Sequence, residues 1–209
     1  EAVRDGITVN LVYDGRAARV MLDNDKVKEI EKYYAQCEQE GANEYQIEES
    51  QKAVAKMEAI IGDPDILRAV AEDFINHYET RVREGATVAG KALFVCANRY
   101  IAYDFYKIVT ELRPEWAEKK ICSDDVILDD KDKKELKPME KIKLVMTRNK
   151  DDEKDLFDML GTKDDRKEFD RQFKNPKSNF KIAIVVDMWL TGFDVPELDT
   201  IYIDKPIQQ

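Results

Sequence analysis

The sequence predicts an α/β fold with a parallel β-sheet, and three observations carry this prediction. First, residues 91–97, 142–146 and 182–186 form near-continuous apolar runs, which are typical of strands buried on both faces. Second, amphipathic helical patterns separate these runs. Third, a further strand-like run at 200–203 continues the alternation. Strands that alternate with helices pair in parallel through right-handed crossovers, so we expect a layered α/β domain.

The first 62 residues carry a different pattern. Two β-prone stretches flank the dipeptide Asp14-Gly15, which favours a hairpin turn. Two stretches with apolar residues at helical spacing follow. We therefore expect residues 1–62 to form an extended, hairpin and helical segment that precedes the α/β domain at 63–209.

Three helical patterns accompany the buried strands. Asp63 can cap a helix whose first residue is a proline, the residue favoured at that position. Asn98 can cap the helix over 101–112, which Pro114 ends. Apolar residues between 156 and 173 mark one or two amphipathic helices on a highly charged background.

Composition excludes several function classes. The 209 residues include 34 basic and 44 acidic ones, a formal charge of -10 that argues against a free-standing, non-specific nucleic-acid binder. A single histidine, His77, argues against a Ser/His/Asp triad or a histidine-based zinc site. The three cysteines lack metal-ligand spacing, which indicates buried thiols in a reducing compartment. No apolar run approaches the roughly 18 residues of a membrane span and no signal peptide is recognisable, so we expect a cytoplasmic protein.

Two apparent motifs fail on physical grounds. Residues 85–92 nearly match a phosphate-binding loop, but Ala92 replaces the Mg²⁺-binding hydroxyl, and a helix precedes the segment where a strand is needed. The acidic segment 129–132 has the composition of a calcium loop but lacks its glycine and its terminal glutamate. We interpret 124–141, in which most residues are charged, as a solvated insertion.

The strongest candidate site follows the third apolar strand. That strand ends at Asp187 and leads into a loop with Thr191, Gly192 and Asp194. In an open parallel sheet, ligands bind beyond the carboxyl ends of the strands. Thr191 can offer a hydroxyl and an amide to a phosphate, Gly192 permits close backbone approach, and Asp194 can accept from a ribose hydroxyl or hold an arginine. An ordinary connection with a capping aspartate is the alternative, and the residues alone leave both open.

At these residues the chain resembles the second motor lobe of superfamily 2 helicases and translocases. More narrowly, it resembles the restriction (R) subunit of type I restriction-modification enzymes. Residues 187–206 are similar to that subunit's form of helicase motif V and its continuation. Residues 91–99 resemble motif IV, 166–173 the helix before the motif V strand, and 72–79 the helix that leads into the lobe. The resemblance is good from about residue 64 onward and weaker before it.

The resemblance implies a RecA-like, three-layer lobe of a large subunit that hydrolyses ATP, pumps DNA past the bound complex and then cuts it. ATP and Mg²⁺ would be bound mainly by a first motor lobe, whose phosphate loop and acidic motif this sequence lacks. Double-stranded DNA would be bound through the parent complex, which also contains the modification and specificity subunits. Residues 1–62 would connect the motor lobes, and 63–209 would be the second lobe, cut before the last helicase motif. We therefore expect the chain alone neither to hydrolyse ATP nor to cut DNA.

The same resemblance assigns roles to single positions, with no catalytic residue and no metal ligand among them. The resemblance assigns nucleotide binding to Gly192 and Asp194. It assigns DNA binding to Asn98, Arg99, Asp187 and Thr191. Two positions depart from the general helicase pattern and fit the type I pattern. Val186 replaces a threonine of many relatives, and Thr191 stands where many helicases carry arginine.

Two other functions remain open. A different superfamily 2 motor would carry a similar lobe, and an arginine pair just after Gln209 would favour the type I family over it. A non-enzymatic Rossmann-like binding domain would have neither a motor lobe nor a phosphate loop encoded upstream.

Overall fold

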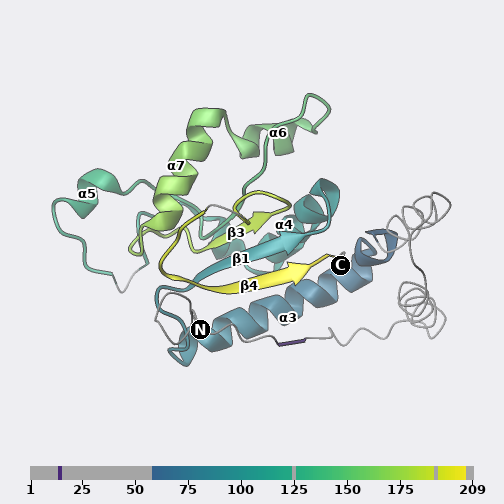
Figure 1. The fold of residues 1–209 in the computed structure, drawn as a ribbon, viewed down its shortest axis with the longest axis horizontal. Coiled ribbons are helices and arrows are strands. Elements are labelled where there is room, and N and C mark those ends of the chain that lie inside the picture. Colours follow the sequence, from purple (N-terminus) through teal and green to yellow (C-terminus); the bar gives the residue numbers. More distant parts are fainter. Residues whose placement is uncertain (1–13, 16–57, 124–125, 191–192, 206–209) are drawn as a thin grey trace, which may run out of the picture.

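The computed structural model describes residues 14–15, 58–123, 126–190 and 193–205 (Figure 1). Both strands of the expected hairpin and the first expected helix lie outside the described residues, as do Thr191 and Gly192. The end of the second expected helix is described, and residues 58–61 are helical up to the turn at Gly62. In chain order, the elements are α3 (Pro64–Arg83), β1 (Lys91–Cys96), α4 (Arg99–Leu112), the 3₁₀ helix η1 (Pro114–Ala117), α5 (Asp132–Glu135), β2 (Ile142–Leu144), α6 (Lys154–Leu160), α7 (Lys163–Lys174), β3 (Ile182–Val185) and β4 (Leu198–Asp204).

The four described strands form one parallel sheet in the order β2-β3-β1-β4. The predicted RecA-like α/β class is therefore confirmed. The three apolar runs lie side by side, since Ala92 of β1 and Ile142 of β2 both pair with Ile182 of β3. These strands are buried on both faces, as their continuous apolar runs predict. Strand β4 lies at the edge, and its residues alternate between half-buried and exposed.

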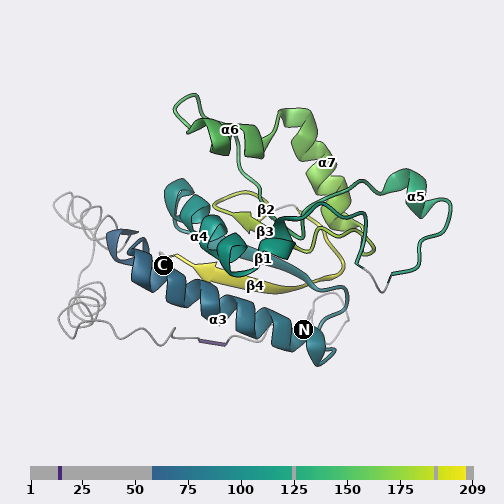
Figure 2. The same cartoon turned by 180° about the vertical axis from the view of Figure 1, so that it is seen from behind.

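Helices cover both faces of the sheet (Figures 1 and 2). On one face, Phe74 of α3 and Phe105 of α4 pack with Phe94 of β1. On the other face, Phe173 of α7 packs with Leu93 of β1. The connection from β1 to β2 runs toward one edge of the sheet, whereas the connections from β2 to β3 and from β3 to β4 run back. Right-handed crossovers in opposite directions place their connections on opposite faces, which accounts for the three layers.

An aromatic cluster forms the centre of the α3–α4 face. The rings of Phe94 and Phe105 are stacked with centroids 3.9 Å apart, and Phe74 lies 5.1 Å from Phe94 and 5.6 Å from Phe105. Phe105 has no exposed surface. Burying one such side chain contributes about 1.5–3 kcal/mol, so this cluster is a main source of stability for the sheet and its two helices.

A row of lysines marks the amino ends of three neighbouring strands. Lys91 is the first residue of β1, and Lys141 and Lys181 stand directly before β2 and β3. The Nζ of Lys91 donates to the Phe180 carbonyl at 2.6 Å, and that of Lys181 donates to the Pro176 carbonyl at 2.6 Å. Burial lowers the pKa of Lys91 to about 6, and the nearby charge of Lys181 adds to this.

The insertion predicted at 124–141 is solvated only in part. Several of its charged residues are exposed, and the side chain of Asp130 is 97% exposed, but those of Asp132 and Glu140 are only 13% and 14% exposed. However, Leu136 and Met139 are buried, and Met139 forms an antiparallel bridge with Lys120. The prediction is therefore wrong for this end of the insertion, because its two apolar residues pack against the domain and the side chain of Glu140 is also largely buried.

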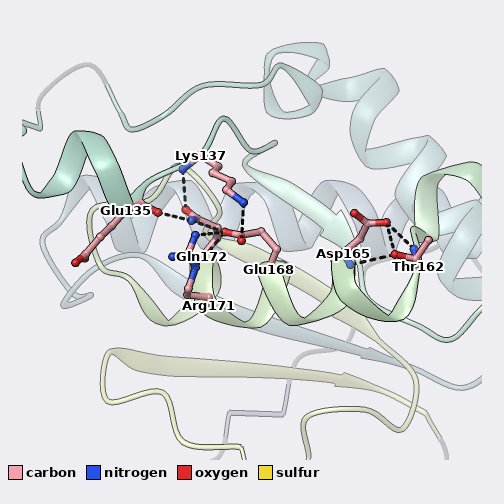
Figure 3. Close-up of polar contacts among 7 residues, drawn as sticks. All are labelled: Glu135, Lys137, Thr162, Asp165, Glu168, Arg171 and Gln172. Carbon is pink, nitrogen blue, oxygen red and sulfur yellow. Dashed lines mark hydrogen bonds and ion pairs between the residues drawn. The ribbon is translucent and has the colours of Figure 1, made fainter.

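Helix α7 begins with a capping box, shown in Figure 3. The hydroxyl oxygen of Thr162 accepts from the Asp165 backbone N–H at 3.2 Å, and the Asp165 carboxylate accepts from the Thr162 N–H at 2.7 Å. Two of the backbone donors at the helix start are thereby satisfied. The hydrogen bonds from Thr162 hold the pKa of Asp165 below its usual value.

Further along α7, the carboxylate of Glu168 accepts hydrogen bonds from three side chains (Figure 3). Its carboxylate accepts from Lys137 at 2.8 Å, from Arg171 at 2.7 Å and from Gln172 at 2.8 Å. Burial by itself would raise the pKa of Glu168, but these hydrogen bonds outweigh it and lower the pKa to about 2. Because Gln172 also donates to the Glu135 carbonyl at 2.9 Å, this cluster attaches the end of α5 to α7.

Candidate functional site at the carboxyl edge of the sheet

The connections that leave β1 and β3 diverge to opposite faces of the sheet. Strand β1 continues into α4, whereas the connection after β3 packs through Trp189 and Phe193 against the α7 face. The two strands are direct neighbours. In open parallel sheets, ligands bind at such a divergence, beyond the carboxyl ends of the strands. The residues that follow β1 and β3 are therefore the candidates, and they include the predicted Asn98, Arg99 and Asp187.

Asn98 caps α4, as its position predicts. Its side-chain oxygen accepts from the backbone N–H groups of Tyr100 at 3.1 Å and Ile101 at 3.0 Å. The residue has an extended backbone, with φ -150° and ψ 176°, as capping residues do. Its side chain thus fixes the direction in which α4 leaves the sheet.

Arg99 is held by the loop between β2 and α6. Its Nη2 donates to the two carboxylate oxygens of Asp152 at 2.6 and 2.7 Å, and its Nη1 donates to the Thr147 carbonyl at 2.7 Å. The side chain of Arg99 is 23% exposed and that of Asp152 only 6%. The predicted DNA-binding guanidinium therefore has a nearly buried carboxylate partner, which sequence reasoning missed. The acidic run 151–153 after the second strand was the available signal.

Asp187 projects into solvent just beyond β3. Its side chain is 84% exposed, and its Oδ1 lies 3.5 Å from the Nζ of Lys205, which follows β4. An exposed pair of this kind contributes about 0–1 kcal/mol, so Asp187 is not tied into the fold. Its carboxylate is accessible at the edge where the resemblance expects it.

Asp194 lies between two anchored residues of the β3–β4 connection. Before it, Phe193 stacks on Trp189 with ring centroids 4.2 Å apart, and Trp189 lies 5.3 Å from Phe173 of α7. After it, Val195 is buried. Asp194 itself is exposed, so the flanking residues hold its backbone while its carboxylate faces water. The spacing of Trp189 and Phe193 was the overlooked signal for this anchoring.

The connection also contains strained backbone. Trp189 has φ 65°, the left-handed region that disfavours residues with a Cβ atom. Such a conformation costs about 1–3 kcal/mol and persists where surrounding packing enforces it. Here the rings of Phe173, Phe180 and Phe193 surround the indole. The strain adds support for a functional role of this segment.

Asp204 ends β4 at the same edge of the sheet and has an unusual environment. Its Oδ2 is buried and has no hydrogen-bond partner in the described part of the chain. Burial raises the pKa of Asp204 to about 6. It pairs in register with Cys96 of β1, whose thiol is buried and whose pKa burial also raises. Sequence reasoning did not single out Asp204.

The structure thus brings three of the six predicted site residues to one region, since Asn98, Arg99 and Asp187 follow neighbouring strands at the carboxyl edge. Asp194 lies apart from them, because the preceding Phe193 packs against Phe173 and Lys174 at the end of α7, near Lys91 at the amino end of β1. Their assignments to DNA and nucleotide stay predictions. No group of three or more His, Cys, Asp or Glu side chains that could hold a metal ion occurs among the described residues. Within the same residues, no helix is both long and apolar enough to cross a membrane.

Comparisons with known proteins agree on one family. A family model described as type I restriction enzyme subunit R domain 3 matches residues 88–209. The chain is 33% identical to a putative type I restriction enzyme MjaIXP endonuclease subunit of Methanocaldococcus jannaschii, with 100% of this chain and 17% of that protein covered. It is 31% identical to the type I restriction enzyme HindI endonuclease subunit of Haemophilus influenzae, with the same coverage of 100% and 17%. No solved structure matches the chain.

Proposed function

Because the chain belongs to the R subunit family of type I restriction enzymes, we propose that it is the second motor lobe of such a subunit. In this role the lobe supplies one wall of an ATP cleft and part of a DNA track. The observation that carries the proposal is the carboxyl edge of the parallel sheet, where accessible polar residues follow β1 and β3 in a chain of this family. The chain spans 17% of the length of its relatives, so the activity belongs to a larger assembly.

Two ligands are assigned to the lobe. DNA phosphates would be bound at the start of α4, where Arg99 carries a cation and the helix N-terminus adds positive potential. The nucleotide would approach the β3–β4 connection, where Asp194 can accept hydrogen bonds from ribose hydroxyls. An exposed carboxylate on an anchored backbone fits that task. Mg²⁺ would be held mainly by the first motor lobe.

The cycle that we propose couples lobe closure to DNA movement. ATP bound between two lobes favours the closed arrangement, and hydrolysis releases it. Alternating grip on the DNA backbone then moves the duplex, and the choice of sequence belongs to other subunits of the complex. The partners would be double-stranded DNA and the modification and specificity subunits, in the cytoplasm.

The test replaces Asp194 in the full-length subunit assembled with its partners. We expect Asp194→Ala to lower DNA-stimulated ATP hydrolysis about ten-fold or more, since a hydrogen bond to a charged group contributes about 1.5–3 kcal/mol. The matched control is Asp130→Ala, which removes another exposed carboxylate, in the insertion, and should leave turnover unchanged.

Unchanged turnover of the Asp194 variant at both limiting and saturating ATP would refute the assignment. We also expect negligible ATP hydrolysis by the purified 209-residue chain. Robust turnover by that chain would contradict the division of labour between two lobes.

A further inference from the structure

The contacts of Arg99 join three separate segments of the fold. Arg99 opens α4, Thr147 follows β2, and Asp152 precedes α6. The Asp152 carboxylate also accepts from the backbone N–H of Asn149 at 2.7 Å, so its own loop helps to fix its position. Charge-assisted contacts of this length are among the stronger hydrogen bonds in proteins.

This ion pair is more shielded from water than the pair between Arg68 and Glu111. The Asp152 side chain is 6% exposed, whereas in the pair between Arg68 and Glu111 the two side chains are 44% and 65% exposed. A carboxylate so shielded from water keeps its arginine partner in one geometry. An exposed pair lets both side chains move, because solvent competes for each.

The Arg99 guanidinium nevertheless keeps hydrogen-bonding capacity. It has five N–H donors, and its contacts with described residues involve Nη1 and Nη2 but not Nε. Its side chain is 23% exposed, so part of it faces water at the start of α4. Arg99 can therefore hold Asp152 on one side and a phosphate oxygen on the other.

We propose that Asp152 is the positioning residue for Arg99, fixing the guanidinium at the α4 N-terminus so that its remaining donors meet a DNA phosphate. The inference rests on the proposed function, because it names the residue that orients one of the proposed DNA contacts. Side chains that bind a ligand are held in place by partners of their own, and loss of such a partner weakens binding without removing the binding group.

The experiment measures DNA-stimulated ATP hydrolysis by the full-length subunit in its complex, as a function of DNA and salt concentration. Asp152→Asn keeps the shape of the side chain and removes its charge. We expect the DNA concentration for half-maximal stimulation to rise about three- to ten-fold, with the maximal rate and the salt dependence retained. Arg99→Ala should raise it at least as much and also lower the salt slope by about one, because a phosphate contact is lost.

Two further variants sharpen the comparison. Glu111→Gln breaks the exposed pair with Arg68 and should change neither the half-saturating DNA concentration nor the maximal rate. Asp152→Glu keeps the charge on a longer side chain and should restore part of the affinity. If Asp152→Asn lowers the unfolding temperature strongly, a smaller affinity shift in the same direction is sought in Asp152→Glu.

The outcomes separate the two proposals. If Arg99→Ala leaves the DNA dependence unchanged, the proposed DNA contact fails, and with it the positioning role. If Arg99→Ala weakens DNA binding but neither Asp152 variant does, only the positioning role fails. If Asp152→Asn tightens DNA binding, the carboxylate competes with phosphate for Arg99, which also overturns the proposal.

Discussion

Replacing Asp204 by asparagine should stabilise the protein in a pH-dependent way. Burial raises the pKa of this carboxyl group from its usual 3.8 to about 6. Between these values the folded chain retains a proton that the unfolded chain has lost, so the stability of the wild type falls as pH rises through this window. Above it, ionised Asp204 stays in the fold with one oxygen buried and unpartnered. The raised pKa of Asp204 therefore lowers the free energy of unfolding of the wild type by about 3 kcal/mol at pH 8. The same loss is about 1.5 kcal/mol at pH 5 and about 0.5 kcal/mol at pH 4.

Urea unfolding of wild type and Asp204→Asn at pH 4, 5 and 8 measures this penalty. The buried amide of asparagine carries a desolvation cost of its own, but that cost is the same at every pH. The difference between the two proteins should therefore grow by about 2–3 kcal/mol from pH 4 to pH 8. Asp187→Asn is the control, because its 84% exposed carboxylate should give a small and nearly constant difference. Parallel stability curves for wild type and Asp204→Asn would refute the assigned burial penalty.

Three further perturbations test other parts of the fold. Lys91→Met removes a buried amine whose pKa of about 6 lies below the usual 10.5. The stability of the wild type should therefore rise between pH 6 and 10.5, whereas that of the variant should not. Urea unfolding midpoints at pH 7 and pH 10 measure this difference. Thr162→Ala should cost about 1 kcal/mol by removing the α7 cap, whereas Thr162→Ser should keep it, as thermal unfolding will show. Glu168→Gln should lower stability at pH 7 by at most about 1 kcal/mol because solvent screens the cluster. Since the pKa of Glu168 is lowered to about 2, its contribution is complete above pH 4.5 and vanishes as pH falls toward 2, so an unchanged difference in acid would contradict it.

Local signals predicted the main elements well. The run 91–97 and the capping Asn98 predicted β1 and the start of α4, because burial on both faces and helix capping each leave a pattern within a few residues. Strand β2 is shorter than the run 142–146, since its last partnered residue is Leu144, although Val145 and Met146 are also buried. The apolar run therefore marks burial more faithfully than it marks strand length.

The partners within the site could not be read from local patterns. Arg99 and Asp152 are 53 residues apart, and they meet only because two connections leave the same edge of the sheet. Asp204 belongs to a strand whose exposure alternates, so its residue type gave no sign that one carboxylate oxygen is buried. Both contacts depend on the packed arrangement of the strands, and a single sequence does not specify this arrangement.

The lysines at the amino ends of the strands have a consequence for folding. Strands β1, β2 and β3 are apolar on both faces, so sliding one strand past its neighbour by a residue would still bury hydrophobic side chains. Lys91 reduces this degeneracy between β1 and β3, since its amine donates to the carbonyl of Phe180, two residues before β3, in the native alignment. A slipped strand would leave an amine in the apolar layer without an acceptor, at a cost of several kcal/mol. Lys91 therefore favours the native alignment of β1 with β3 during folding.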